Sequence, residues 1–115
     1  MKLILPMPPS INQTYGISRF SMYKRKPVKD WERTAGYEIL SQRKCSKDPF
    51  TGSVIVNIEW YYNAERDIDA GIKVLLDLFQ KMNIYLNDSQ VHELHVTKCQ
   101  DTMKPRVEAE INEIS

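Results

Sequence analysis

The chain has 115 residues, of which 42% are hydrophobic and 27% are charged, and its net charge is +1. This length suits one compact domain with a single hydrophobic core. The two cysteines, Cys45 and Cys99, form no CxxC pair, which argues against a disulfide framework and a paired-cysteine zinc site. No apolar run approaches the length of a membrane span, so we expect a soluble intracellular protein.

The charges are unevenly distributed along the chain. Residues 1–47 contain ten lysines and arginines against three acids, a balance of +7, whereas residues 48–115 contain six against twelve, a balance of −6. Such polarity suits a protein that contacts a polyanion with one part and binds cations with another. Two oppositely charged surfaces that pair with each other would give the same pattern, so charge alone leaves both interpretations open.

The first half of the chain predicts a strand, a loop and a helix. Residues 2–5 form a short apolar strand that must end at the following prolines, because proline cannot donate to a sheet ladder. Residues 10–26 show no regular period, and a loop this long in a small domain is usually functional or disordered. Apolar residues then recur at helical spacing from Pro27 to about Arg43, which predicts a helix with Trp31 in the core.

The second half predicts a strand, a helix and two further strands. Residues 53–62 alternate between two faces and are rich in β-forming side chains, which is typical of a strand. An apolar stripe predicts a helix over 69–82, and Asn83 suits the residue just beyond its end. Residues 91–99 and 107–114 are predicted to be strands joined in a hairpin. The order β-α-β-α-β-β indicates a single α+β domain with two helices and a small mixed sheet.

Two acidic residues, Asp67 and Asp69, stand between the predicted strand and the second helix. In an extended segment, residues two apart point to the same side, so both carboxylates aim at a common point. Like charges held close together are costly unless a cation or proton lies between them, and Mg²⁺ and Mn²⁺ prefer such oxygen ligands. The alternative is structural: Asp69 suits the N-cap of the helix, and an Asp-x-Asp pair at a helix start is more often a cap plus a surface acid.

Three further charged residues follow Asp69 in the sequence: Lys73, Asp77 and Asp88. Lys73 lies four residues after Asp69, where it would form an exposed ion pair worth about 0.3–0.5 kcal/mol or contact a phosphate. Asp77, another four residues on, is a second partner for Lys73. Asp88 stands in the sequence Asn-Asp-Ser, which is turn chemistry, and a functional role requires this turn to fold back beside Asp67.

Basic and aromatic side chains are interleaved in and after the predicted loop. Lysine and arginine contact phosphates, and aromatic rings stack on unpaired bases, so this stretch suits nucleic acid. A solvated loop and helix face would have the same composition. The residues concerned are Tyr15, Phe20, Tyr23, Lys24, Arg25, Lys26, Lys29 and Arg33.

Three motifs together resemble the RusA family of Holliday junction resolvases. The first is Pro-Met-Pro-Pro-Ser-Ile-Asn at residues 6–12. The second is Arg-Asp-Ile-Asp at 66–69 with a lysine four residues after its last aspartate, and the third is Asp-Ser-Gln-Val at 88–91. The resemblance covers essentially residues 1–115 as a single domain. Family members commonly have asparagine straight after the second aspartate, whereas this chain has Ala70.

The resemblance implies a homodimeric, magnesium-dependent endonuclease, with Mn²⁺ able to substitute and no membrane or small-molecule cofactor. Its substrate would be a four-way DNA junction, nicked on symmetrically related strands in recombination and repair, in the cytoplasm of a bacterium or of a phage-infected host. Asp67, Asp69 and Asp88 would be catalytic metal ligands, and Lys73 a catalytic or phosphate-contacting base. The expected nucleic-acid contacts are Asn12, Lys24, Arg25, Lys26, Lys29 and Arg66.

Two other functions stay open at this point. A junction-binding or DNA-packaging accessory protein would keep the same scaffold without cutting DNA, and the Ala70 departure favours this alternative. A small intracellular interaction domain would use Asp67 and Asp69 only as a helix cap and a surface acid. Magnesium-dependent nicking of a four-way junction separates the first function from both alternatives.

Overall fold

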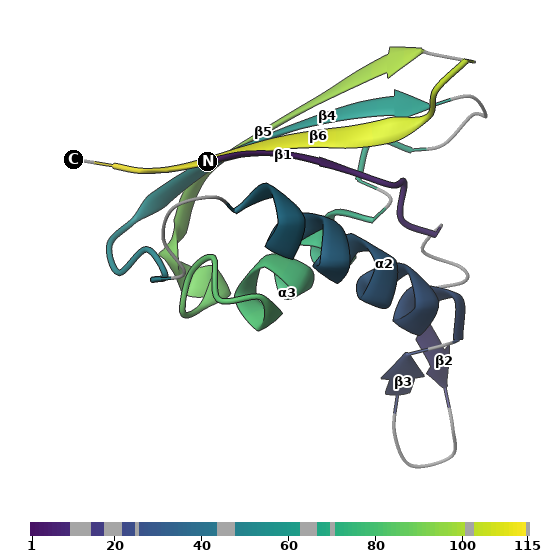
Figure 1. Ribbon diagram of the computed structural model, residues 1–115, viewed down its shortest axis with the longest axis horizontal. Helices are drawn as coiled ribbons and strands as arrows, with labels where there is room; N and C mark the ends of the chain where they lie inside the picture. The colour runs from purple at the N-terminus through teal and green to yellow at the C-terminus, as the bar shows by residue number, and fades with distance from the viewer. Residues whose placement is uncertain are drawn as a thin grey trace.

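In the computed structural model, the described residues form two helices on one face of a four-stranded sheet, with a small separate hairpin (Figure 1). The structure describes residues 1–9, 15–17, 22–24, 26–43, 48–62, 67–69, 71–100 and 103–114. The elements are β1 (Lys2–Leu5), β2 (Tyr15–Ile17), β3 (Met22–Lys24), α2 (Lys26–Gln42), β4 (Val54–Tyr62), α3 (Ile72–Lys81), a 3-10 turn η1 (Asp88–Gln90), β5 (Val91–Gln100) and β6 (Arg106–Glu113). The α+β class and the mixed sheet are confirmed.

The stretch predicted to be a loop contains a short hairpin. Strands β2 and β3 pair antiparallel, with Tyr15 opposite Lys24, and form a sheet of their own. Strands of three residues are too short to show an alternation in the sequence, which is why the pattern did not predict them. Figure 1 shows this hairpin beyond the N-terminal end of α2 and away from the main sheet.

The strand order of the main sheet is β1-β6-β4-β5, with β4 parallel to β5 and antiparallel to β6. The predicted hairpin between the last two strands is therefore wrong, because β5 and β6 lie on opposite sides of β4. Helix α3 is the crossover that parallel pairing of β4 and β5 requires. Most side chains of β5 are exposed, which suits an edge strand, whereas most side chains of β4 are buried or half-buried, which suits a central strand.

The core lies between the sheet and the two helices. Trp31 of α2 is only 6% exposed, as predicted, and its indole N–H donates to the carbonyl of Pro6 at 2.8 Å. This bond holds the proline-rich segment after β1 against the helix. The core side chains of β4 and α3 are Val54, Val56, Ile58, Trp60, Val74, Leu75, Leu78 and Phe79.

The helix ends agree with the sequence pattern at three of four positions. Helix α2 runs from Lys26 to Gln42, within one residue of the prediction at each end. Helix α3 ends at Lys81, and Asn83 just beyond it has a φ of 59°, which is the left-handed conformation of a helix end. In the part of the chain that the structure describes, no helix is both long and apolar enough to cross a membrane.

Candidate active site on helix α3

The acidic segment before α3 is tied to the core at its centre. Trp60, at the end of β4 and 1% exposed, donates its indole N–H to the carbonyl of Ile68 at 2.8 Å. Ile68 lies between Asp67 and Asp69, both of which are exposed. The two carboxylates therefore project into solvent from a backbone whose position a core residue holds.

Asp69 does not cap the helix. Helix α3 begins at Ile72, and its N-cap is Gly71 with a φ of 94°, a conformation that glycine adopts without strain. The backbone carbonyl of Asp69 takes part in the turn, accepting a hydrogen bond from the Ile72 N–H at 3.3 Å. The interpretation of Asp69 as the N-cap of this helix is therefore wrong, because Gly71 occupies that position.

A second group of charged side chains lies along α3. The Lys73 Nζ is 3.3 Å from Asp77 Oδ2, which confirms the ion pair that the four-residue spacing predicted. Asp88, from η1, lies against this pair, where both charges and the hydroxyl of Tyr85 act on its carboxyl group. Tyr85 is fully buried and donates its hydroxyl proton to the Leu76 carbonyl at 2.8 Å. The turn that carries Asp88 has therefore folded back onto α3.

The carboxyl group of Asp88 is in an unfavourable environment. Its Oδ1 atom is buried and has no hydrogen-bond partner in the described part of the chain. Burial raises the pKa of Asp88 above its ordinary value, the nearby charge of Asp77 raises it further, and Tyr85 and Lys73 only partly oppose these effects. A divalent cation at Oδ1 would offset both the missing partner and the repulsion, so the chemistry of this position fits a metal ligand.

The three aspartates are not assembled into one cluster. Among the described residues, no three acidic, histidine or cysteine side chains lie close enough together to form a ready metal site. The structure brings Asp88 to Lys73 and Asp77, and leaves Asp67 and Asp69 exposed on the approach to the same helix. The place of Asp77 beside Asp88 was not foreseen, because no sequence pattern relates a helix residue to a turn eleven positions later.

The structure describes three of the six residues that are expected to contact nucleic acid. Lys29 is exposed on α2. Lys24 and Lys26 are placed by their backbone alone, in β3 and at the start of α2. The remaining three, Asn12, Arg25 and Arg66, lie outside the described residues. The nucleic-acid contacts therefore stay a prediction.

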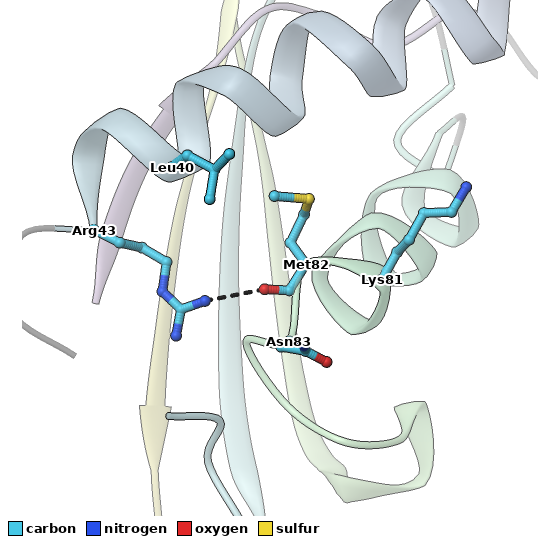
Figure 2. Close-up of a pocket in the computed structure, with 5 residues that line it drawn as sticks. All are labelled: Leu40, Arg43, Lys81, Met82 and Asn83. Atoms are coloured by element: carbon cyan, nitrogen blue, oxygen red, sulfur yellow. Dashed lines mark hydrogen bonds between the residues drawn. The ribbon is translucent and has the colours of Figure 1, made fainter. Parts of the chain in front are cut away.

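A cavity of about 200 Å³ lies where the C-terminal ends of α2 and α3 meet, and Figure 2 shows the residues around it. Arg43 reaches across it and donates to the Met82 carbonyl at 3.0 Å, so the guanidinium group satisfies a free carbonyl at the end of α3. Lys81 pairs with Glu32 of α2 at 2.8 Å. These cations hold the two helices together, and the cavity lies at the other end of α3 from Asp67 and Asp69.

Exposed carboxylates, a lysine and a buried, unpartnered carboxylate oxygen around one helix are the groups that phosphodiester-cleaving sites use. The chain matches the family described as Endodeoxyribonuclease RusA over residues 6–112. It is 30% identical over 94 residues to the crossover junction endodeoxyribonuclease RusA of Aquifex aeolicus (strain VF5), covering 82% of this chain and 74% of the relative. The chain therefore belongs to the RusA family.

Replacing Trp60 with phenylalanine tests how the acidic segment is held. Trp60→Phe keeps an aromatic ring in the core but removes the N–H that binds the Ile68 carbonyl. We expect the free energy of unfolding to fall by about 1–3 kcal/mol, from the lost bond and the smaller ring. The NMR order parameter of the Ile68 backbone should fall from about 0.85 towards 0.6, while that of Val56 stays constant. An unchanged value at Ile68 would show that the indole does not hold the segment.

Replacing Asp88 with asparagine tests its electrostatic environment. A raised folded-state pKa means that ionising Asp88 disfavours the fold, so this cost is absent below the ordinary pKa of aspartate, grows as pH rises from that value to the raised pKa, and is complete above it. In the presence of EDTA, Asp88→Asn should therefore be more stable than wild type at pH 7, with the difference vanishing in acid. The control Glu93→Gln, at an exposed position of β5, should show no such pH dependence. A loss of stability that is equal at every pH would contradict the assignment.

Proposed function

We propose that this protein is a magnesium-dependent endonuclease that resolves four-way DNA junctions by paired, symmetric nicks. The observation that carries the proposal is the buried Oδ1 atom of Asp88, which has no hydrogen-bond partner among the described residues and lies near Lys73 of α3, the helix that Asp67 and Asp69 precede. Family membership supports DNA cleavage, and the name of the Aquifex aeolicus relative supports a crossover junction as substrate.

The proposed roles follow from exposure and charge. Asp67, Asp69 and Asp88 would hold Mg²⁺, or Mn²⁺ in its place. The bound ion would supply an activated water and neutralise charge that develops on the scissile phosphate. Lys73 has a side chain that is 72% exposed and pairs with Asp77 at 3.3 Å, so a phosphate arriving from solvent can reach its ammonium group.

The charges of the sheet indicate which side of the molecule DNA approaches. On the face of the sheet away from the helices, Glu59 and Glu110 are exposed and Glu108 is half-buried. Glu108 pairs with Arg106 at 2.7 Å, and Glu59 accepts a hydrogen bond from Tyr61 at 2.6 Å that raises the pKa of Tyr61 to about 12. Lys2 and Arg106 lie on the same face, but the three glutamates outnumber them, so this face would repel phosphates. DNA is therefore proposed to approach from the side of α2 and α3.

The proposed assembly is a homodimer acting in the cytoplasm of a bacterium or of a phage-infected host. A four-way junction has two-fold symmetry, and a two-fold dimer presents two identical sites to equivalent strands. One site per subunit would then account for the paired nicks. The basic residues named above, Lys24, Arg25, Lys26 and Lys29 together with Asn12 and Arg66, are proposed to contact the arms of the junction.

A non-cleaving junction-binding protein is the second candidate. The feature that favours it is Ala70, which follows Asp69 where family members commonly have asparagine. Such a protein would bind the junction with equal affinity whether or not magnesium is present, and would leave all four strands intact.

A cleavage assay with a synthetic four-way junction separates the two candidates. We expect paired nicks with Mg²⁺ and none with EDTA. Asp67→Asn should lower the nicking rate at least about 100-fold while leaving junction binding equal or tighter, because it removes a ligand and one negative charge near DNA. The matched control Glu93→Gln removes a charge from an exposed position of β5 and should cut at the wild-type rate. Binding without nicks at every magnesium concentration would exclude the endonuclease.

A further inference from the structure

The side chain of Gln90 uses its full hydrogen-bonding capacity to hold the turn that carries Asp88. Its Oε1 atom accepts from the backbone N–H groups of Leu86 at 2.7 Å and Asn87 at 2.9 Å. Its Nε2 atom donates to the carbonyls of Phe50 at 2.8 Å and Gly52 at 2.9 Å. Two donors and two acceptor positions are all that an amide offers, so one side chain joins the turn to the segment that enters β4.

A second amide fixes the same turn from the helix side. The Oε1 atom of Gln80 accepts from the backbone N–H of Asp88 at 2.9 Å. Gln80 lies on α3 one turn after Asp77, so the backbone of Asp88 is tied to the helix that also carries Lys73. The turn thus has one attachment to the entry of β4 and another to α3.

These attachments matter because the contacts of the Asp88 carboxylate alone do not fix its position. Its Oδ1 atom is buried and has no hydrogen-bond partner in the described ranges. The side chains of Tyr85 and Asp77 lie within hydrogen-bonding reach of the carboxyl group, but Asp77 is itself an acid, and its negative charge repels an ionised Asp88. Without support from the backbone, the turn would relieve this repulsion by moving the carboxylate outwards into solvent.

We infer that Gln90 is a positioning residue that holds the Asp88 carboxylate in place for a divalent cation. The inference rests on the proposed function insofar as Asp88 is taken as a metal ligand. Removing a group that hydrogen-bonds to a metal-binding residue, without touching the metal itself, commonly weakens metal affinity by about 10–100-fold. Only an amide fits the four contacts, because a carboxylate at Gln90 would place an acceptor against the carbonyls of Phe50 and Gly52.

The chain offers a matched control in Gln42. Its side-chain amide also makes a two-sided contact with the backbone, accepting from the Ile4 N–H and donating to the Ile4 carbonyl, both at 2.8 Å. This contact lies between α2 and β1, and it involves neither the Asp88 turn nor α3. Gln42→Met therefore removes these two backbone hydrogen bonds, and one to Glu38 at 3.2 Å, without disturbing Asp88.

The test measures Mn²⁺ binding to the full-length protein by isothermal titration calorimetry, without DNA. We expect Gln90→Met to raise the Kd for Mn²⁺ at least about tenfold and Gln42→Met to leave it unchanged. Amide hydrogen exchange should accelerate at Leu86 and Asn87 in Gln90→Met alone. Gln90→Asn, which keeps an amide but is one methylene too short to make all four contacts, should give an intermediate Kd and keeps the test usable if the methionine variant fails to fold.

Equal Mn²⁺ affinities of the Gln90 and Gln42 variants would overturn the inference. A wild-type protein that binds no Mn²⁺ would overturn both this inference and the proposed function. Nicking of a four-way junction in the same preparations separates the two. If wild type binds Mn²⁺ and Gln90→Met weakens that binding, but wild type cuts no junction, the positioning role stands and the proposed function fails. If wild type cuts and Gln90→Met cuts and binds Mn²⁺ normally, only the positioning role fails.

Discussion

The structure depends on β4 being paired along both edges. Because β6 takes one edge and β5 the other, the chain must cross from β4 to β5 through a helix, and that helix is α3. The crossover places the acidic segment between the end of β4 and the start of α3. The return from α3 to β5 then places Asp88 against the same helix. The topology of one strand therefore brings the charged residues of the candidate site to a single element.

The site combines rigid attachment with electrostatic repulsion. Trp60 holds the backbone between Asp67 and Asp69, and the amide of Gln90 holds the turn of Asp88. The half-buried carboxylate that results is costly in the metal-free protein, since it lies beside Asp77 and its buried Oδ1 atom lacks a hydrogen-bond partner among the described residues. A fold that maintains such a cost at one position is consistent with a cation that offsets it on binding.

The sequence predicted the features that depend on local periodicity. The alternation of β4, the burial of Trp31 and the ion pair of Lys73 with Asp77 all follow from spacing, and all are confirmed. The predicted hairpin of β5 and β6 was wrong, because two neighbouring strands in sequence give no sign that an earlier strand lies between them. The N-cap interpretation of Asp69 was wrong because the N-cap is Gly71, with its positive φ, and the helix begins at Ile72, three residues later than predicted. The contacts around Asp88 include those of Gln90 with Phe50 and Gly52, about forty residues earlier, and a local sequence pattern cannot predict contacts at that separation.

If Asp88 is a metal ligand, its Oδ1 atom, which lacks a hydrogen-bond partner among the described residues, should coordinate the ion. The anomalous difference map of a crystal grown with Mn²⁺ measures this. We expect an ion about 2.0–2.2 Å from Asp88 Oδ1, a coordination distance for a divalent cation of this kind. An ion held only by Asp67 and Asp69, with Asp88 Oδ1 still free of any ligand, would contradict it, as would a map with no ion at α3.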